Sequence, residues 1–321
     1  MITMKDIASK LRSFDTHNVT FWDFESITEN GDMWNLLIDT MTNRYKKQAI
    51  DFIVCLDARG FLLGGAIACA LGGKVGIKLI RKAGKLPGPV HSVEYGLEYR
   101  DKDVVEIQDS QVMKGKRVLV VDDVLATGGT AAAAVELVER VGGIVAGLAF
   151  AIEIPFLEGR SKLLNYMVTS EISIINDVPY AEVEYCVDMM TIDSRDKELI
   201  LIERLNYPEG IAMPGGRIED ESPITAAKRE LMEETGCKAD LLHYLGILSR
   251  PDRDPRGVKV SIVMGCISDS SNARGEPGKT KIVRVPSLQN LPPDEKILFG
   301  HRDFICMTYP NLVPSHVPSI N

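Results

Sequence analysis

Two adjacent aspartates beside a glycine turn are the first residues whose types and spacing suggest chemistry. Asp122 and Asp123 end a buried-strand pattern, and the turn at 126–130 follows them. Glycines let such a turn approach a ligand closely, and the N-terminus of the following helix attracts an anion. Carboxylates beside a phosphate suit a ligand that also carries hydroxyl groups or shares a divalent cation. The stretch predicts a site for a phosphorylated, hydroxyl-bearing ligand; turn and helix capping are the more common use of these residue types.

Three glutamates form a second chemical group. Glu230, Glu233 and Glu234 have the spacing i, i+3 and i+4, which places them on one face of a helix. Their charges repel one another unless a cation offsets them, and oxygen ligands suit Mg²⁺ or Mn²⁺. The spacing predicts a metal site, against the ordinary alternative of a solvated acidic helix face.

Apolar runs separated by helical patterns must position the two aspartates. Runs that are apolar throughout indicate strands buried on both faces of a parallel sheet. We therefore expect an α/β domain whose parallel sheet is flanked by helices, with ligands beyond the carboxyl ends of its strands. The expected strands are 51–57, 74–80, 117–123 and 143–154, and the expected helices end near residue 71 and cover 130–141.

The glutamates belong to a second region with a different texture. A single expected helix at 222–235 is surrounded by strand patterns and Pro-, Gly- and Asp-rich connections, which predicts an α+β domain. A proline and an Asn-Asp pair place the boundary between domains 1–177 and 178–321. The expected strands are 180–192, 197–205 and 258–267, with a surface loop at 268–281.

Length and charge exclude several classes of protein. A chain of 321 residues is long enough for two domains. The net charge of −8 argues against a non-specific nucleic-acid binder, and neither a long apolar run nor a signal-like N-terminus predicts a membrane or secreted protein. The 6 cysteines lack the spacing of a metal site or a disulfide framework. We expect a cytoplasmic protein with small-molecule partners and with no nucleic-acid or membrane partner.

The aspartate motif resembles a known nucleotide-binding loop. DDVLATGGT (122–130) resembles the loop that binds 5-phosphoribosyl-1-diphosphate (PRPP) in type I phosphoribosyltransferases. LDARGF (56–61), LIRKAGKLPGP (79–89) and YGLEY (95–99) resemble adenine phosphoribosyltransferase in their order and spacing. The similarity spans about residues 15–175. It implies the type I phosphoribosyltransferase fold and a homodimer.

The resemblance implies a PRPP site assembled from three segments. The basic side chains would contact the diphosphate, where positive charge stabilises the leaving group. The aspartates would bind the ribose hydroxyls directly or through the metal. The implied PRPP-binding residues are Asp57, Ala58, Arg59, Gly60, Arg81, Lys82, Lys85, Asp122, Asp123, Ala126, Thr127, Gly128, Gly129 and Thr130.

The same resemblance implies where the base binds. Glu98 corresponds to the catalytic glutamate near the purine imidazole nitrogen, and Tyr99 lies beside it. Phe21 and Trp22 belong to FWDFES (21–26), the segment that frames the base, with Trp22 where the family usually has arginine. The alternative for Trp22 is a place in the core.

The glutamate motif resembles a Nudix box. PGGRIEDESPITAAKRELMEETGC (214–237) has one residue fewer than usual between its double glycine and Glu221. The resemblance implies an α/β/α sandwich and metal-assisted attack of water on a nucleoside diphosphate. Arg229 would orient the carboxylates through Glu221. The implied metal ligands are Gly215 or Gly216, Glu230 and Glu234, and the implied catalytic residues are Glu230, Glu233 and Glu234.

A further segment indicates the substrate. SRPDRDPRG (249–257) resembles a segment of ADP-ribose pyrophosphatases. It implies that Arg253 and Arg256 bind a phosphate or the terminal ribose of ADP-ribose, whereas the alternative pairs them with Asp252 and Asp254 in a surface turn. The candidates for the general base are Glu276, Asp294 and Glu295.

The two resemblances predict a bifunctional nucleotide-salvage enzyme with Mg²⁺ or Mn²⁺ at both sites. Its first half would make AMP and diphosphate from adenine and PRPP, and its second half would split ADP-ribose into AMP and ribose 5-phosphate. One alternative gives the second half a nucleoside triphosphate or another sugar nucleotide. Another alternative, a ligand-sensing transcriptional regulator, is disfavoured by the acidic charge and the complete carboxylate sets.

Overall fold

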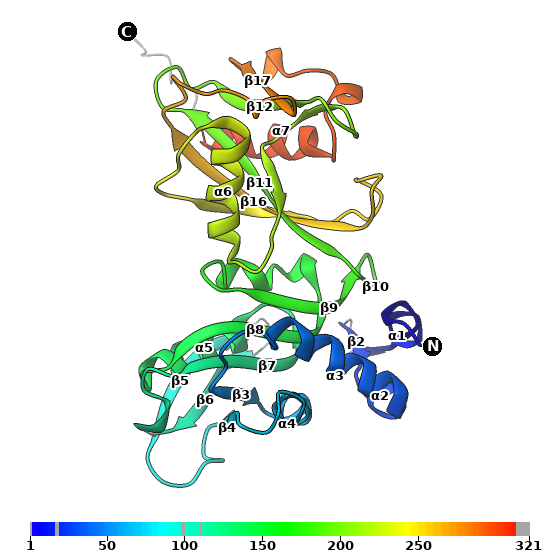
Figure 1. The fold of residues 1–321 in the computed structure, drawn as a ribbon, viewed down its shortest axis with the longest axis vertical. Helices are drawn as coiled ribbons and strands as arrows, with labels where there is room; N and C mark the ends of the chain where they lie inside the picture. Colours follow the sequence, from blue (N-terminus) through cyan, green and yellow to red (C-terminus); the bar gives the residue numbers. More distant parts are fainter. Residues whose placement is uncertain (1, 17–18, 98–99, 110, 313–321) are drawn as a thin grey trace. The chain divides into compact units, whose positions relative to one another are not determined.

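The computed structural model describes residues 2–16, 19–97, 100–109 and 111–312, and the chain divides into two compact units (Figure 1). Unit 1 is Met1–Val183 and unit 2 is Glu184–Asn321. The division falls after Val183 rather than after residue 177, because the short strand β10 (Val178–Ala181) pairs with β9 (Val168–Ile175) of unit 1. Within the described ranges, no helix has the length and hydropathy of a membrane span.

Unit 1 contains a mixed sheet of eight strands in the order β10-β9-β8-β7-β3-β4-β6-β5. The apolar runs become the parallel strands at its centre, whereas β5, β6 and β10 pair antiparallel at its edges. The predicted α/β class is therefore confirmed, with antiparallel edges that the apolar runs did not indicate. The remaining strands are β3 (Phe52–Leu56), β4 (Gly76–Lys82), β5 (Val90–Leu97), β6 (Arg100–Gln108), β7 (Arg117–Leu125) and β8 (Ile144–Glu153).

Both faces of this sheet are buried under separate cores. Alternate residues of β7 point to opposite faces, so Leu119 and Val121 join one core and Val118 and Val120 join the other. Helices α3 and α4 cover the first face and α5 covers the second. The helices and short elements are α1 (Met4–Lys10), the hairpin β1 (Arg12–Thr16) and β2 (Val19–Asp23), α2 (Glu25–Thr28), α3 (Gly31–Tyr45), α4 (Arg59–Ala70), η1 (Gln111–Met113), α5 (Gly129–Arg140), η2 (Pro155–Leu157) and η3 (Gly159–Lys162).

Unit 2 has a sheet of seven strands with the path β13-β12-β11-β16-β15, on which β14 pairs with β11 and β17 with β12. β11 and β16 run parallel in the middle. Ile305 of α7 and Met190 of β11 belong to one hydrophobic core, and α6 lies against β11 and β14. The elements are β11 (Glu184–Asp193), β12 (Leu199–Arg204), β13 (Gly210–Ala212), β14 (Gly215–Arg217), α6 (Pro223–Thr235), β15 (His243–Leu248), β16 (Lys259–Ser268), β17 (Thr280–Val285), η4 (Leu288–Asn290), η5 (Asp294–Lys296) and α7 (His301–Leu312).

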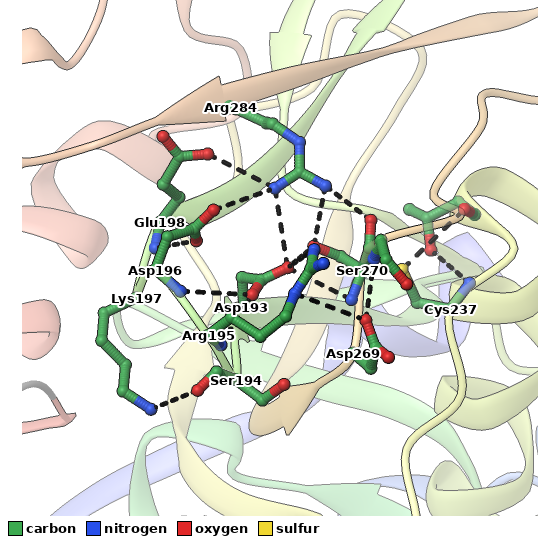
Figure 2. Close-up of polar contacts among 12 residues, drawn as sticks. Asp193, Ser194, Arg195, Asp196, Lys197, Glu198, Cys237, Asp269, Ser270 and Arg284 are labelled. Carbon is green, nitrogen blue, oxygen red and sulfur yellow. Dashed lines mark hydrogen bonds and ion pairs between the residues drawn. The ribbon is translucent and has the colours of Figure 1, made fainter.

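A buried carboxylate fixes one end of this sheet (Figure 2). Asp193, at the end of β11, is 0% exposed and accepts hydrogen bonds from the backbone N–H of Arg195 at 2.8 Å and of Ser270 at 3.2 Å. Arg284 of β17 lies 3.6 Å from the same carboxylate and also pairs with Glu198 of the turn at 3.3 Å. Burial alone would raise the pKa of Asp193, but the hydrogen bonds from Ser270 and Arg195 hold it far below its usual value. Asp193 therefore joins β11, β17 and the loop after β16 as one structural cluster.

Candidate functional site

The carboxyl ends of β3, β4 and β7 bring the predicted PRPP-binding segments to one edge of the first sheet. Asp57 follows β3 directly, and its carboxylate accepts from Nε of Arg81 in β4 at 3.1 Å. A Cβ added to Gly60 would lie 3.0 Å from Oδ1 of Asp122, so the 57–60 loop packs closely on the acidic pair. The parallel pairing of these strands explains why the three segments meet, since their carboxyl ends lie at the same edge.

The acidic pair lies inside β7, which continues to Leu125, two residues beyond the end expected at residue 123. Oδ1 of Asp122 accepts from the backbone N–H of Asp123 at 2.9 Å. Asp123 is 5% exposed, and its Oδ2 lies 2.7 Å from Nε of Arg59 in an ion pair whose angles do not make a hydrogen bond. Burial, followed by the charge of Asp123, raises the pKa of Asp122 well above its usual value. A buried carboxylate oxygen without a hydrogen-bond donor fits a cation or a ligand hydroxyl group.

The glycine turn leads into α5 as the sequence requires for an anion site. Gly128 is the N-cap of α5 with φ 75°, a conformation that favours glycine, and it has no side chain to occupy the N–H groups of the first turn. Those groups and the positive end of the helix dipole face the position of an incoming anion. Tyr95 of β5 lies beside the turn, where a Cβ added to Gly129 would be 3.2 Å from its ring.

The other basic groups predicted for this site lie around its rim. Lys82 forms an ion pair with Asp103 at 3.1 Å, and Lys85 is exposed. Arg81 and Lys82 therefore have carboxylate partners that a phosphate would replace. Such exchange is inexpensive, because ion pairs near the surface contribute about 0–1 kcal/mol each.

The base-framing segment divides its two aromatic residues between surface and core. Phe21 is 50% exposed, and the guanidinium of Arg59 lies 5.3 Å from its ring centroid. Trp22 points to the opposite face of β2, is 7% exposed and belongs to the core, which is the alternative expected for it. Phe14, which the sequence did not single out, lies opposite Phe21 in the β1–β2 register and is 53% exposed. The predicted Glu98 and Tyr99 lie outside the described residues.

In unit 2, two glutamates of α6 and Glu221, which precedes the helix, gather around the guanidinium of Arg229. Nη1 of Arg229 donates to Glu230 at 2.6 Å and to Glu233 at 3.4 Å. Its Nε and Nη2 donate to Oε1 of Glu221 at 2.9 Å and 2.6 Å. Arg229 therefore contacts three carboxylates and restrains the side of α6 that carries the glutamates.

The double glycine contacts Glu230, which is partly buried, and Glu234, which is buried. The backbone N–H of Gly215 donates to Oε2 of Glu234 at 2.8 Å. A Cβ added to Gly216 would lie less than 3.0 Å from all three carboxyl atoms of Glu230, so only a glycine leaves this carboxylate its position. Burial raises the pKa of Glu234 to about 7 and, through a smaller contribution, the charge of Glu230 acts in the same direction.

The donor set of this region suits a divalent cation that is completed by other ligands. Burial also raises the pKa of Glu230, against the opposing effect of Arg229. Two neighbouring carboxylates with raised pKa values are the expected ligands of a cation, because a bound cation favours their charged forms. Within the described parts of the chain, no three His, Cys, Asp or Glu side chains converge tightly enough to hold a metal alone. Backbone, water or substrate oxygens would have to complete the coordination.

A buried aspartate–histidine pair lies next to the double glycine. The sequence did not predict this pair. Asp188 of β11 pairs in register with Gly215. Nδ1 of His301, on α7, accepts from the backbone N–H of Met213 at 3.0 Å, so Nε2 carries the proton that faces Asp188 at 3.2 Å. Burial would raise the pKa of Asp188, but His301 and Arg253 favour its charged form and hold the pKa at about 2. The available sequence signal was the carboxylate of Asp188 in the middle of the mostly apolar run 185–192.

The predicted ADP-ribose-binding arginines are both engaged within the protein. Arg253 is 7% exposed and donates to the backbone carbonyl oxygens of Lys259 at 3.3 Å and Phe299 at 3.4 Å. Arg256 donates to both oxygens of Asp254, at 2.9 Å and 2.7 Å, which matches the pairing alternative. Their roles in ligand binding stay predictions that these contacts do not favour.

The three candidates for the general base lie in two places. Glu276 pairs with Lys279 at 2.6 Å in the loop before β17. That loop is joined to α6, because the backbone N–H of Arg274 donates to the carbonyl oxygen of Thr235 at 2.9 Å. Asp294 and Glu295 lie in η5. Glu276 is therefore on the loop that contacts the glutamate helix.

Comparison with known proteins identifies both halves of the chain. The family model of the phosphoribosyl transferase domain matches residues 23–189, and that of the NUDIX domain matches residues 185–307. An adenine phosphoribosyltransferase from Clostridium perfringens is 45% identical over 169 residues, which are 53% of this chain and 96% of the relative. One from Chloroflexus aurantiacus is 44% identical over 165 residues, 50% of this chain and 94% of the relative.

A solved structure extends the likeness to three dimensions. Adenine phosphoribosyltransferase from Thermoanaerobacter pseudethanolicus is 38% identical, with a TM-score of 0.51, and the match covers 53% of this chain and 99% of that one. The type I fold expected for unit 1 is confirmed by this match. The chain is therefore an enzyme that belongs to the phosphoribosyl transferase family and carries a NUDIX hydrolase domain in its second half.

Proposed function

We propose that this enzyme salvages nucleotides by two reactions. Unit 1 transfers phosphoribose from PRPP to adenine, which gives AMP and diphosphate, and unit 2 hydrolyses ADP-ribose to AMP and ribose 5-phosphate. The observation that carries the first reaction is the buried Oδ2 of Asp123, which no described residue supplies with a hydrogen-bond donor and which precedes the glycine turn. The names of the relatives matched by unit 1 support adenine as the accepting base.

In unit 1, the acidic and the basic side chains at the carboxyl ends of the strands bind different parts of PRPP. Asp122 and Asp123 bind the ribose hydroxyls directly or through Mg²⁺. Arg59, Arg81 and Lys82 exchange their carboxylate partners for the diphosphate. When bound, the cation neutralises diphosphate oxygens and so favours departure of this group. The exposed ring of Phe21 offers an apolar face for a purine, whereas the core position of Trp22 removes it from direct contact with the base.

In unit 2, the carboxylates on α6 hold Mg²⁺ or Mn²⁺, with Glu230 kept in place by Arg229 and Glu234 by the backbone N–H of Gly215. Glu230 and Glu234 are the two ligands, with Glu233 at the more exposed edge of the set. A bound cation polarises the diphosphate oxygens and makes attack by water easier. Hydrolysis of a nucleoside diphosphate linkage follows from this set of groups; ADP-ribose as the particular substrate rests on the resemblance of residues 249–257.

Hydrolysis of ADP-ribose is the direct test of the second reaction. With Mg²⁺ present, we expect the purified chain to release AMP and ribose 5-phosphate in equal amounts, detected by ion-exchange chromatography. ATP, GTP and UDP-glucose should be hydrolysed at least about tenfold more slowly, since a pocket built to pair with substrate groups rejects analogues that lack them. Faster hydrolysis of a triphosphate would replace ADP-ribose as the substrate and leave the metal site unchanged.

Gly216→Ala should weaken hydrolysis without unfolding unit 2. The added Cβ meets only the far end of the Glu230 side chain, which can turn away, and the φ of Gly216 is not in the left-handed region. Displacing a carboxylate ligand by about 1 Å is expected to lower the rate by roughly 10- to 100-fold. The measurement is the hydrolysis rate beside the thermal midpoint of unfolding. The transferase rate of the same sample is the control, and an unchanged hydrolysis rate would contradict the placement of Glu230 in the site.

A further inference from the structure

A fully buried ion pair lies behind the glycine turn of unit 1 and is not part of the predicted site. Arg160 of η3 is 1% exposed and Glu153, at the end of β8, is 2% exposed. Nε of Arg160 donates to Oε1 of Glu153 at 2.8 Å, and Nη2 donates to Oε2 at 2.8 Å. The hydroxyl of Ser170 donates to the same Oε2 at 2.7 Å. Such complete pairing is what a buried ion pair needs in order to be tolerated.

Arg160 ties together the connection between β8 and β9. Its guanidinium reaches back to Glu153 and forward to the carbonyl oxygen of Val168, to which Nη1 donates at 2.8 Å. The hydroxyl of Tyr166, in the same connection, donates to Glu139 of α5 at 2.8 Å. The connection is thus attached to both strands and to the helix that begins at the glycine turn.

The residue before Arg160 contacts the turn through its backbone. A Cβ added to Gly159 would lie less than 3.0 Å from the carbonyl oxygen of Ala126, and one added to Gly128 would lie less than 3.0 Å from the carbonyl oxygen of Gly159. The backbone N–H of Ile154 also donates to the carbonyl oxygen of Leu125 at 2.9 Å. Two glycine backbones therefore meet with no side chain between them, and a shift of Gly159 is transmitted to the turn.

We propose that Glu153 and Arg160 are positioning residues for PRPP: the pair holds Gly159 against residues 126–128 and keeps the turn in the shape that receives a phosphate group. This inference rests on the proposed phosphoribosyl transfer. Neither side chain touches a predicted substrate group, so the pair acts through Gly159. If the turn spends time in other conformations, the apparent affinity for PRPP falls in proportion to the population of the binding-competent conformation. The effect must fall on PRPP and spare the base.

A second arginine–glutamate pair, with a buried carboxylate on the same sheet and an arginine side chain that is 46% exposed, provides a control. Glu171 of β9 has a side chain that is 2% exposed, and Arg44 of α3 donates to its two oxygens at 2.8 Å and 3.0 Å. The chemistry is the same as in the Glu153–Arg160 pair. Its partners, however, belong to α3 and β9, neither of which carries the glycine turn.

The test compares Glu153→Gln with Glu171→Gln in the full chain. We expect Glu153→Gln to raise the KM for PRPP, and the Kd for PRPP from calorimetry without adenine, by about tenfold, with the KM for adenine changed by less than about twofold. Glu171→Gln should leave all three constants within about twofold, although it also removes an arginine partner from a buried carboxylate and so lowers the thermal midpoint. Gly159→Ala keeps the ion pair but pushes on Ala126, so it should reproduce the PRPP effect even if Glu153→Gln folds poorly.

Three results would overturn the inference. They are equal changes in the PRPP and adenine constants, the same PRPP effect in Glu171→Gln, or normal PRPP binding in Gly159→Ala. If the unaltered chain binds PRPP but does not consume adenine, the proposed transfer fails instead. The calorimetric comparison still decides the role of the pair in that case.

Discussion

Asp123→Asn is expected to lower phosphoribosyl transfer by at least about 100-fold and to leave hydrolysis by unit 2 unchanged. The carboxylate is 5% exposed, and its Oδ2 has no hydrogen-bond donor among the described residues. Asparagine keeps the volume but carries no charge, so the ribose hydroxyls or a shared cation lose the acceptor they need. Arg59 also loses its ion-pair partner, which leaves it free for the diphosphate. The loss should therefore appear in kcat more than in the affinity for diphosphate.

The measurement is the initial rate with adenine, PRPP and Mg²⁺, beside the rate with ADP-ribose for the same sample. Asp51→Asn is the matched control. Asp51 precedes β3 and accepts from the backbone N–H of Arg117 at 2.9 Å, so it lies at the amino ends of β3 and β7, away from the predicted site. This control should keep transfer within about twofold. Equal losses in the two variants would point to a disturbed sheet and not to a role of Asp123 in the reaction.

Glu234→Gln should have the reciprocal effect, a loss of about 1000-fold in hydrolysis with transfer retained. The variant keeps an oxygen that can accept from the N–H of Gly215, so the double glycine remains in place. Because burial raises the pKa of Glu234 to about 7, its charge costs folding free energy from the unfolded pKa upward. A neutral amide is therefore expected to preserve the thermal midpoint at pH 8, and the lost rate reports the missing ligand charge.

Glu233→Gln provides a graded comparison on the same helix. The side chain of Glu233 is 54% exposed and lies 3.4 Å from Arg229, so it contributes less to a buried cation than Glu234 does. A loss of about tenfold is expected for it. If Glu233→Gln were the more damaging change, the assignment of Glu230 and Glu234 as the principal ligands would be wrong. Direct Mn²⁺ titration followed by electron paramagnetic resonance gives the same ranking without turnover.

The central strands of unit 1 could be predicted from the sequence because each one is marked by its own apolar run of residues. An uninterrupted apolar run such as that before Asp122 indicates a strand buried on both faces, and such strands form the middle of the unit 1 sheet. The strands β5 and β6 interleave charged and apolar residues at the edge of the sheet, where they resemble loops, and they were not expected. Pro310 obscured α7, which nevertheless continues through it to Leu312.

Site residues that are distant in the sequence could not be related to one another before the structure was known. Spacing along one helix was enough to relate Glu230 to Glu234, whereas Asp188 and His301 are separated by 113 residues and meet only through packing. The burial of Arg253 also depends on tertiary structure, since its partners are carbonyl oxygens from a strand and from a distant loop. In β2, neighbouring aromatic residues could not be assigned to core or surface until the strand pairing gave each a face.

The strand β10 determines where the two enzymes can be parted. Only Glu182 and Val183 separate it from β11, yet Val178–Ala181 pairs with Ile172–Ile175 of β9. If the chain were cut after residue 177, unit 1 would lose β10, and the N–H and C=O groups of β9 that pair with it would be exposed. Such an unpaired edge strand promotes aggregation. The two units can therefore be expressed separately, or joined to other domains, with both sheets intact only if the chain is divided at Glu182 or Val183.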